Sequence, residues 1–291
     1  MVTRIPLGEF EVYSFVENRM HLDGGAMFGI IPKKLWSRHQ TSDEANLIPL
    51  DLNLLLVKAH GKTFLLDTGC GDVGTEKDIK VYGLRTPTQL DAQLARCGVS
   101  PEGIDYVLFS HMHFDHAGGG LKRDSNGRAV TRFPNAKYVV SKAEWENVTR
   151  PTARTRAAYA PEYFEAYSDS GQILTVDGET ELYPGISLHP TGGHTSGHQG
   201  IEIRSEDKAI GFYADIFPTT SHLRTAWIAA MDTHPMDSFD VKQDILARCV
   251  DQSVWLAFDH DIHTRLSAVV EKDGHHEIRP LPPEAMQDIN T

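Results

Sequence analysis

The sequence predicts an α/β protein built as one αββα sandwich. Short apolar segments that are typical of strands alternate with segments of helical periodicity, and this alternation occurs in two similar halves. No Pro-rich or Ser-rich linker separates the halves, which favours a single domain over residues 1–291. The hydrophobic content of 40% is ordinary for a globular protein with a sizeable core.

The spacing of apolar residues predicts the elements of the first half. Residues 88–97 have helical spacing, and Ser141 with Glu144 forms a capping-box pattern that predicts the start of another helix. Residues 150–170 are rich in Ala, Tyr and Arg, so we expect a helical insertion over one face near 141–170. Alternating or short apolar runs predict strands over residues 8–16, 52–58, 62–66, 104–109 and 138–140.

The second half returns to short strands. Helical spacing recurs over residues 236–249, and a final hairpin is expected to turn at 272–274. Apolar runs predict strands over residues 173–176, 186–189, 200–203, 209–213 and 253–258.

Residues 20–36 contain three glycines, a proline and large apolar side chains without a regular period. We expect a long apolar loop there. Such a loop covers a substrate pocket or contacts another subunit, unless it is an ordinary buried connector.

Composition excludes several function classes. The net charge of −12, with no cluster of Lys and Arg, argues against a nucleic-acid partner and favours a small-molecule substrate. No segment approaches 18 uninterrupted apolar residues, so no membrane span is expected. The three cysteines are far apart in sequence and no secretory signal is evident, so we expect free thiols and a cytoplasmic location.

Four metal-capable side chains fall within six residues in the pattern H-x-H-x-D-H: His111, His113, Asp115 and His116. An apolar run precedes them and glycines follow, so the cluster lies on a loop that leaves a strand end. Alternate side chains of an extended segment share a face, so His111 and His113 point the same way. Asp115 and His116 are adjacent and diverge, which suits a second centre nearby. Imidazole and carboxylate ligands suit Zn²⁺ or a neighbouring transition metal.

Other strand ends bear the same residue types. His194 lies in a Gly-rich segment, and Asp215 and His260 each follow an apolar strand. A single His or Asp at a strand end is usually structural, but three beside the H-x-H-x-D-H cluster favour metal ligation. Asp67, at the end of strand 62–66, is expected to orient a ligand histidine or to bond turn amides.

Together these motifs resemble the metallo-β-lactamase superfamily, over nearly the whole chain. Within it, residues 24–36 and 134–145 look like those of quorum-quenching N-acyl-homoserine lactonases, particularly the YtnP-type proteins. The resemblance implies an αββα fold with metals at the strand ends of one sheet edge. It also implies two metal sites, whose ligands are His111, His113 and His194 for one ion, Asp115, His116 and His260 for the other, and Asp215 bridging both.

The resemblance implies a metal-dependent hydrolase that opens a lactone ring by a metal-bridging hydroxide. We expect two divalent ions per chain, zinc before cobalt, manganese or iron. Asp115 is the candidate to orient the hydroxide and protonate the leaving alkoxide. The apolar loop near 20–36 is the candidate site for an acyl chain and for a homodimer contact.

One position departs from the family pattern. Several lactonases of this superfamily have a tyrosine three residues after the bridging aspartate, where its hydroxyl contacts the substrate carbonyl. Pro218 stands there in this chain, and His222 is the candidate replacement.

The alternatives are other hydrolases on the same scaffold. Phosphotriester hydrolysis stays open, as does a thioesterase, although the 31 residues after His260 indicate strands rather than a helical domain. A nuclease is disfavoured by the charge. A di-iron oxygen reductase would have Glu in place of His113, and a binding-only protein would have lost ligands.

Overall fold

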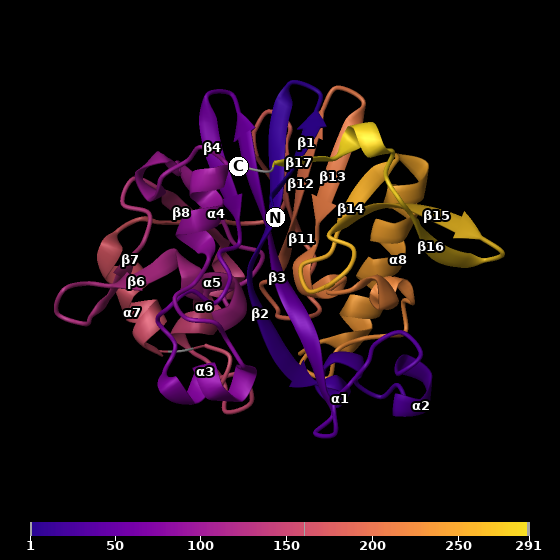
Figure 1. Ribbon diagram of the computed structural model, residues 1–291, viewed down its shortest axis with the longest axis horizontal. Coiled ribbons are helices and arrows are strands. Elements are labelled where there is room, and N and C mark those ends of the chain that lie inside the picture. The colour runs from indigo at the N-terminus through magenta and orange to yellow at the C-terminus, as the bar shows by residue number, and fades with distance from the viewer. Residues whose placement is uncertain (1, 160, 290–291) are drawn as a thin grey trace.

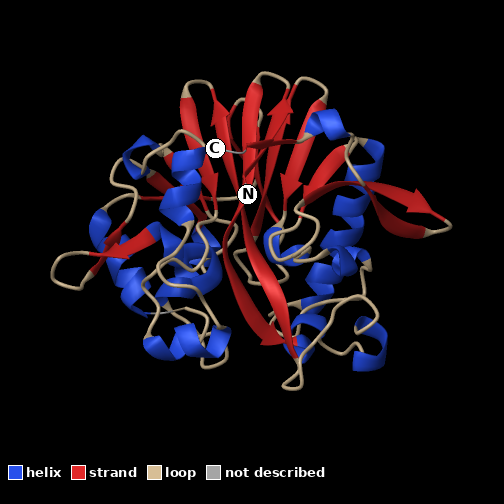
Figure 2. Ribbon diagram, viewed as in Figure 1, coloured by secondary structure: helices blue, strands red, loops and turns tan. Residues whose placement is uncertain are grey.

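Two β-sheets lie face to face in the computed structural model, and helices cover their outer faces (Figures 1 and 2). The structure describes residues 2–159 and 161–289. The first sheet contains, from edge to edge, β17 (Gln287–Ile289), β1 (Val2–Leu7), β2 (Phe10–Asp23), β3 (Leu47–Ala59), β4 (Lys62–Leu66), β5 (Tyr106–Leu108), β8 (Lys137–Ser141) and β9 (Ile173–Val176). The second contains β10 (Thr180–Tyr183), β11 (Ile186–Pro190), β12 (Gln199–Ser205), β13 (Lys208–Phe212), β14 (Val254–Ala257), β15 (Leu266–Lys272) and β16 (His275–Arg279).

The helices are α1 (Gly24–Phe28), α2 (Lys33–Trp36), α3 (Glu76–Tyr82), α4 (Leu90–Arg96), α5 (Phe114–Ala117), α6 (Lys142–Thr149), α7 (Pro161–Ser170) and α8 (Pro235–Asp251). A small hairpin joins β6 (Leu121–Arg123) and β7 (Ala129–Thr131), and 3₁₀ turns occupy Pro101–Gly103, Gly118–Gly120, Ala214–Ile216, Thr220–Leu223 and Pro283–Ala285. The αββα sandwich predicted from the sequence is confirmed. Among the residues that the structure describes, no helix is long and apolar enough to cross a membrane.

Strand β3 shows why central strands contain continuous apolar runs, here Leu54–Val57. Leu54 and Leu56 pack with residues of α4 and α7 on the outer face, whereas Leu55 and Val57 pack between the sheets. Successive side chains of a strand point to opposite faces, so a strand covered on both sides needs a continuous apolar run. On the other side of the molecule, α8 packs its apolar face on the second sheet.

Strand direction brings the site together. Strands β4 and β5 are parallel neighbours, as are β13 and β14, and β11 runs the same way as β13 because β12 is antiparallel to both. The carboxyl ends of β4 and β5 therefore lie at the same edge of the first sheet, and those of β11, β13 and β14 lie at the same edge of the second. The loops that follow these strands contain all the predicted metal ligands.

Residues 20–36 differ from the expected loop. Strand β2 continues to Asp23, whose side chain accepts from the Gly25 amide at 2.6 Å and caps α1; α2 follows. The side chains of Phe28 and Trp36 stack at 5.1 Å and are buried with Trp227. A 3.6-residue period is not visible over helices of four or five residues, which explains why the sequence pattern indicated only a loop.

Several further elements were not predicted, among them β1, α3 and the β6–β7 hairpin. Strands β10 and β17 lack a clear pattern, and β17 forms only by pairing with β1 at the other end of the chain. Residues 153–159 form turns rather than helix, and α7 starts at Pro161.

Candidate metal centre

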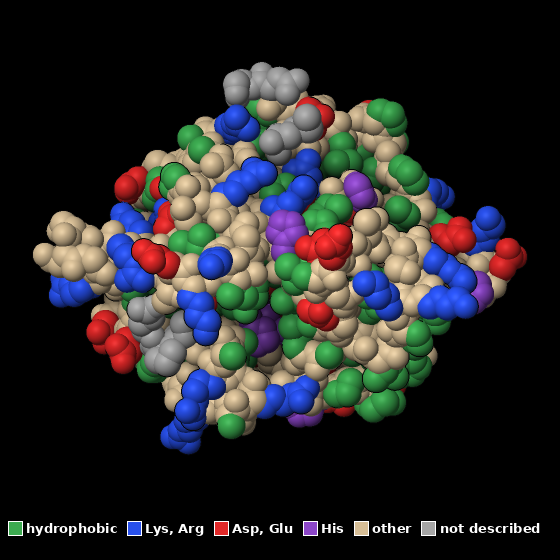
Figure 3. Space-filling view, turned by 60° about the horizontal axis from the view of Figure 1, so that its bottom comes forward, with side chains coloured by type: hydrophobic (Ala, Val, Ile, Leu, Met, Phe, Trp, Pro, Cys, Tyr) green, Lys and Arg blue, Asp and Glu red, His purple; other side chains and the backbone are tan. Residues whose placement is uncertain are grey.

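All seven predicted ligands lie in the segments that follow strands at one edge of the sandwich. Seen from the lower side of Figure 1, the surface is hollowed near its centre, and histidine side chains are visible in the hollow (Figure 3). The residues are His111 and His113 after β5, Asp115 and His116 on α5, His194 between β11 and β12, Asp215 after β13, and His260 after β14. Each of them is at least nine-tenths buried.

The first group of potential ligands is His111, His113, His194 and Asp215. One ligand atom from each lies within 4.8 Å of the other three. The Nε2 atom of His194 is 2.9 Å from Asp215 Oδ2 and 3.0 Å from His113 Nδ1. The Nε2 atom of His111 is 3.6 Å from the same Asp215 oxygen.

A second group consists of His116, Asp215, Asp259 and His260, within the same 4.8 Å limit. The Nε2 atom of His116 is 3.6 Å from Asp215 Oδ2, and that of His260 is 3.1 Å from Asp215 Oδ1. Asp215 therefore presents one oxygen toward His111, His194 and His116 and the other toward His260. Asp215 thus belongs to both groups of potential ligands.

Asp115 lies beside the second group. Its Oδ2 atom is 3.7 Å from His260 Nε2 and 3.8 Å from His116 Nε2. The carboxylate thus reaches the same space as those two imidazoles, as expected from the H-x-H-x-D-H pattern.

The donor set fits metal ions. The Nε2 atoms of His111 and His116 are buried and have no hydrogen-bond partner in the described part of the chain. Burial, reinforced by neighbouring histidines, holds the pKa of His111 and of His113 well below the usual value, so both are neutral with a lone pair free to ligate. Orphaned imidazole nitrogens and carboxylates converging on one space suit a first-row transition metal.

Contacts to the ring nitrogens that face away from the cluster fix the orientation of four of the ligand histidines. The opposite ring nitrogens contact Ser110 Oγ (His111, 3.0 Å), Asp67 Oδ2 (His116, 2.8 Å), Asp232 Oδ1 (His194, 2.9 Å) and the Asp51 carbonyl (His260, 3.0 Å). Such contacts fix the tautomer of a ligating histidine and raise its basicity.

Asp67 serves both roles that the sequence suggested. It orients His116, and it accepts hydrogen bonds from the Ser110 amide (2.8 Å) and the Ser110 hydroxyl (2.7 Å). The loop after β4 also packs tightly on the 3₁₀ turn that follows α5. A Cβ atom on Gly119 would lie 2.0 Å from the Thr68 carbonyl oxygen, so only glycine allows this approach.

Glu144 connects two ligand loops, a role that sequence reasoning missed. Only half of the predicted capping box forms: the Glu144 amide donates to Ser141 Oγ. The Glu144 carboxylate is fully buried and accepts from the Met112 amide (3.0 Å) and Thr195 Oγ1 (2.6 Å). It also accepts from Tyr159 Oη and Asn147 Nδ2, at 2.7 and 3.1 Å.

Asp259 and Asp232 were also missed. Asp259 precedes a predicted ligand at a strand end, a signal that could have identified it. Asp232 lies in a turn with no periodic pattern, and only the fold brings it to His194.

The structure does not support the catalytic role predicted for His222. Its Nδ1 atom is 2.9 Å from Thr219 Oγ1, and its Nε2 atom is 3.0 Å from the Met27 carbonyl oxygen. The ring stacks on Phe28 and is 1% exposed. With both nitrogens bonded inside the protein, no donor remains for a substrate, so we do not assign His222 to the catalytic machinery.

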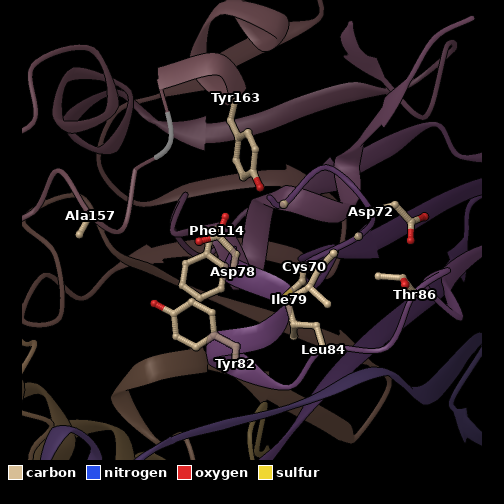
Figure 4. A pocket seen from close by; sticks show the side chains of 12 residues that line it. Cys70, Asp72, Asp78, Ile79, Tyr82, Leu84, Thr86, Phe114, Ala157 and Tyr163 are labelled. Carbon is tan, nitrogen blue, oxygen red and sulfur yellow. The ribbon is translucent and has the colours of Figure 1, made fainter. Parts of the chain in front are cut away.

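A pocket opens beside α5 (Figure 4). The rings of Tyr82 and Phe114 lie side by side with centroids 4.8 Å apart, and Ile79 and Leu84 lie next to them. Phe114 directly precedes Asp115, so this apolar wall adjoins the metal-ligand cluster.

The curated proteins similar in sequence to this chain include N-acyl homoserine lactonases. An N-acyl homoserine lactonase of Bacillus cereus is 28% identical over 185 residues, which cover 60% of this chain and 66% of that protein. The chain thus spans just under two thirds of that relative's length. An N-acyl homoserine lactonase of Agrobacterium fabrum, AiiB, is 26% identical over 252 residues, covering 80% of this chain and 87% of that protein.

Solved structures give the same fold. A probable metal-dependent hydrolase from Staphylococcus aureus has a TM-score of 0.86 and 32% identity, covering 96% of this chain and all of that one. AidC, a dizinc quorum-quenching lactonase solved with N-hexanoyl-L-homoserine, has a TM-score of 0.79 at 21% identity, with 96% and 97% covered. Residues 48–264 match the profile of the metallo-beta-lactamase superfamily. The chain therefore belongs to the metallo-β-lactamase superfamily.

Proposed function

We propose that this chain is a dinuclear metal-dependent hydrolase that opens the lactone ring of N-acyl-homoserine lactones. The observation that supports two ions is the shared position of Asp215, which belongs to both groups of buried potential ligands and has His194 on one oxygen and His260 on the other. The lactone substrate is supported by the curated relatives.

In this proposal His111, His113, His194 and Asp215 hold one ion, and His116, His260 and Asp215 hold the other with Asp115 beside it. Divalent ions held there would lower the pKa of water from about 15.7 to about 7 and polarise an ester carbonyl. Zinc suits the imidazole-rich set, and cobalt, manganese and iron are alternatives.

Asp115 is the residue we assign to proton transfer. Its carboxylate faces the space between His116 and His260. From there it can accept a proton from the attacking water and return it to the leaving alkoxide oxygen, so the proton balance closes when the ring opens. His194 and His116 keep their orientation throughout, because Asp232 and Asp67 hold their far nitrogens.

The acyl chain would lie along the wall formed by Phe114, Tyr82 and Leu84. Phe114 directly precedes Asp115 on α5, and the Tyr82 ring packs on Phe114 with Leu84 beside it in the same pocket. The large side chains of residues 20–36 are less suited to this role, since Phe28 and Trp36 already pack on each other.

The homodimer contact predicted for residues 20–36 stays a prediction. Ile30 and Leu35, which are 94% and 43% exposed, are the side chains that such a contact would cover.

Phosphotriester hydrolysis is the second candidate. A proline occupies the position of the lactonase tyrosine, so the hydroxyl that contacts a lactone carbonyl in several relatives is missing at that position. A reaction that relies on metal ions alone to polarise the substrate is less affected by this loss.

The test compares substrates on one metal-loaded preparation. Proton release is followed with N-decanoyl-homoserine lactone, a phosphotriester and a thioester, with Asp115→Asn as control. We expect the lactone to give the highest kcat/KM and Asp115→Asn to lower it by about 10²–10⁴-fold. A preference for the phosphotriester would replace lactone opening with the second candidate.

A further inference from the structure

Asp259 is a buried carboxylate whose ion-pair contact is with a predicted metal ligand, His260. It lies two residues after the end of β14 and is 2% exposed. Neither of its oxygens accepts a hydrogen bond from any residue that the structure describes. A carboxylate in such a place is strongly destabilising unless a cation or a donor compensates it.

The backbone holds this side chain in place. Asn53 hydrogen-bonds the main chain around Asp259. The backbone amide of Asn53 donates to the Asp259 carbonyl at 2.7 Å, and its side-chain Nδ2 donates to the Phe258 carbonyl at 2.9 Å. A second bond from Nδ2 goes to the Asp261 carbonyl at 2.8 Å. Asn53 therefore fixes the main chain but gives no hydrogen bond to the Asp259 carboxylate.

The carboxylate faces the metal-ligand cluster. Its Oδ2 atom is 3.4 Å from His260 Nε2. One Asp259 oxygen also lies within 4.8 Å of the ligand atoms of His116 and Asp215. Four atoms at these separations can surround a single ion.

We propose that Asp259 is an additional ligand of the ion held by His116, His260 and Asp215. This inference rests on the two-ion site of the proposed function. It makes the two halves of the centre chemically different. One half has three imidazoles and the shared Asp215, whereas the other has two imidazoles and the carboxylates Asp215 and Asp259, with Asp115 alongside.

The difference has a consequence for metal preference. Carboxylate oxygens suit harder ions such as Mn²⁺, and imidazoles suit Zn²⁺. The half that contains Asp259 should therefore bind Mn²⁺ more tightly than the half of three imidazoles does.

The experiment titrates Mn²⁺ into metal-free protein and counts bound ions by electron paramagnetic resonance. Wild type should bind two ions, one more tightly than the other. Asp259→Asn, which keeps the shape and removes the charge, should weaken the tighter site by at least about tenfold and leave the other unchanged. Asp105→Asn is the control for charge, because Asp105 is paired with Lys62 at the opposite end of β5.

Thermal unfolding excludes a misfolded variant and distinguishes a purely structural role. A ligand adds stability only when metal is bound. Asp259→Asn should therefore unfold no earlier than wild type without Mn²⁺, since it removes a buried negative charge that accepts no hydrogen bond from the described residues, and earlier than wild type with Mn²⁺. A lower melting temperature without Mn²⁺, or two unchanged affinities, would overturn the assignment. Wild type that binds fewer than two ions would instead refute the two-ion site itself.

Discussion

Replacing Glu144 by Gln tests whether one buried carboxylate holds two ligand loops in place. The carboxylate accepts four hydrogen bonds, from Met112, Asn147, Tyr159 and Thr195. A hydrogen bond to a charged group contributes about 1.5–3 kcal/mol, and a neutral one about 0.5–1.5 kcal/mol. Gln offers a single acceptor oxygen, and its NH₂ group faces two of the four donors, so we expect a loss of about 2–4 kcal/mol in unfolding free energy.

The assay is urea unfolding of the metal-free proteins, so that metal affinity does not enter the measurement. Glu146→Gln is the matched control: it makes the same change two residues away on α6 at an exposed position, and should stay within about 0.5 kcal/mol of wild type. Because Met112 lies between His111 and His113 and Thr195 follows His194, Glu144→Gln should also weaken metal binding. Equal unfolding energies for Glu144→Gln and Glu146→Gln would refute the reasoning.

Three further predictions follow from other contacts. Burial lowers the pKa of Lys242 from the usual 10.5 to about 7. Between pH 7 and pH 10.5 the unfolded chain therefore binds more protons at this residue than the folded chain does, so the free energy of unfolding rises with pH. Between pH 7 and pH 9 the unfolding free energy measured in urea should increase by about 2 kcal/mol more in wild type than in Lys242→Met. The same increase in both proteins would contradict this. Asp67→Asn should lower metal affinity about 10–100-fold by releasing His116, measured by competition with a chromophoric chelator; unchanged affinity would exclude this supporting role. Phe114→Ala should raise KM for a decanoyl substrate much more than for a short-chain one in steady-state kinetics, whereas equal increases would move the acyl chain elsewhere.

The sequence was sufficient for the fold because its signals are local. The segment Leu54–Val57 of β3 is buried on both faces and is therefore a continuous apolar run, which makes it visible without any knowledge of its neighbours. The H-x-H-x-D-H motif is equally local. His194, Asp215 and His260 could be linked to it because strand ends of the same direction meet at one edge of a sheet.

Residues whose role depends on distant partners could not be assigned in this way. Glu144 matched a capping box, yet its carboxylate bonds Thr195, 51 residues further along the chain. Asp232 reaches His194 only after folding. His222 looked like a free functional group, but the fold occupies both of its ring nitrogens.

Metal-dependent lactone opening is the central claim, and its most direct test is proton release from N-decanoyl-homoserine lactone while Zn²⁺ is titrated into metal-free protein. We predict that turnover rises with bound metal, reaches its maximum at two ions per chain, and falls by about 10²–10⁴-fold in Asp115→Asn. Full activity without metal, or no lactone turnover with two ions bound, would contradict the account.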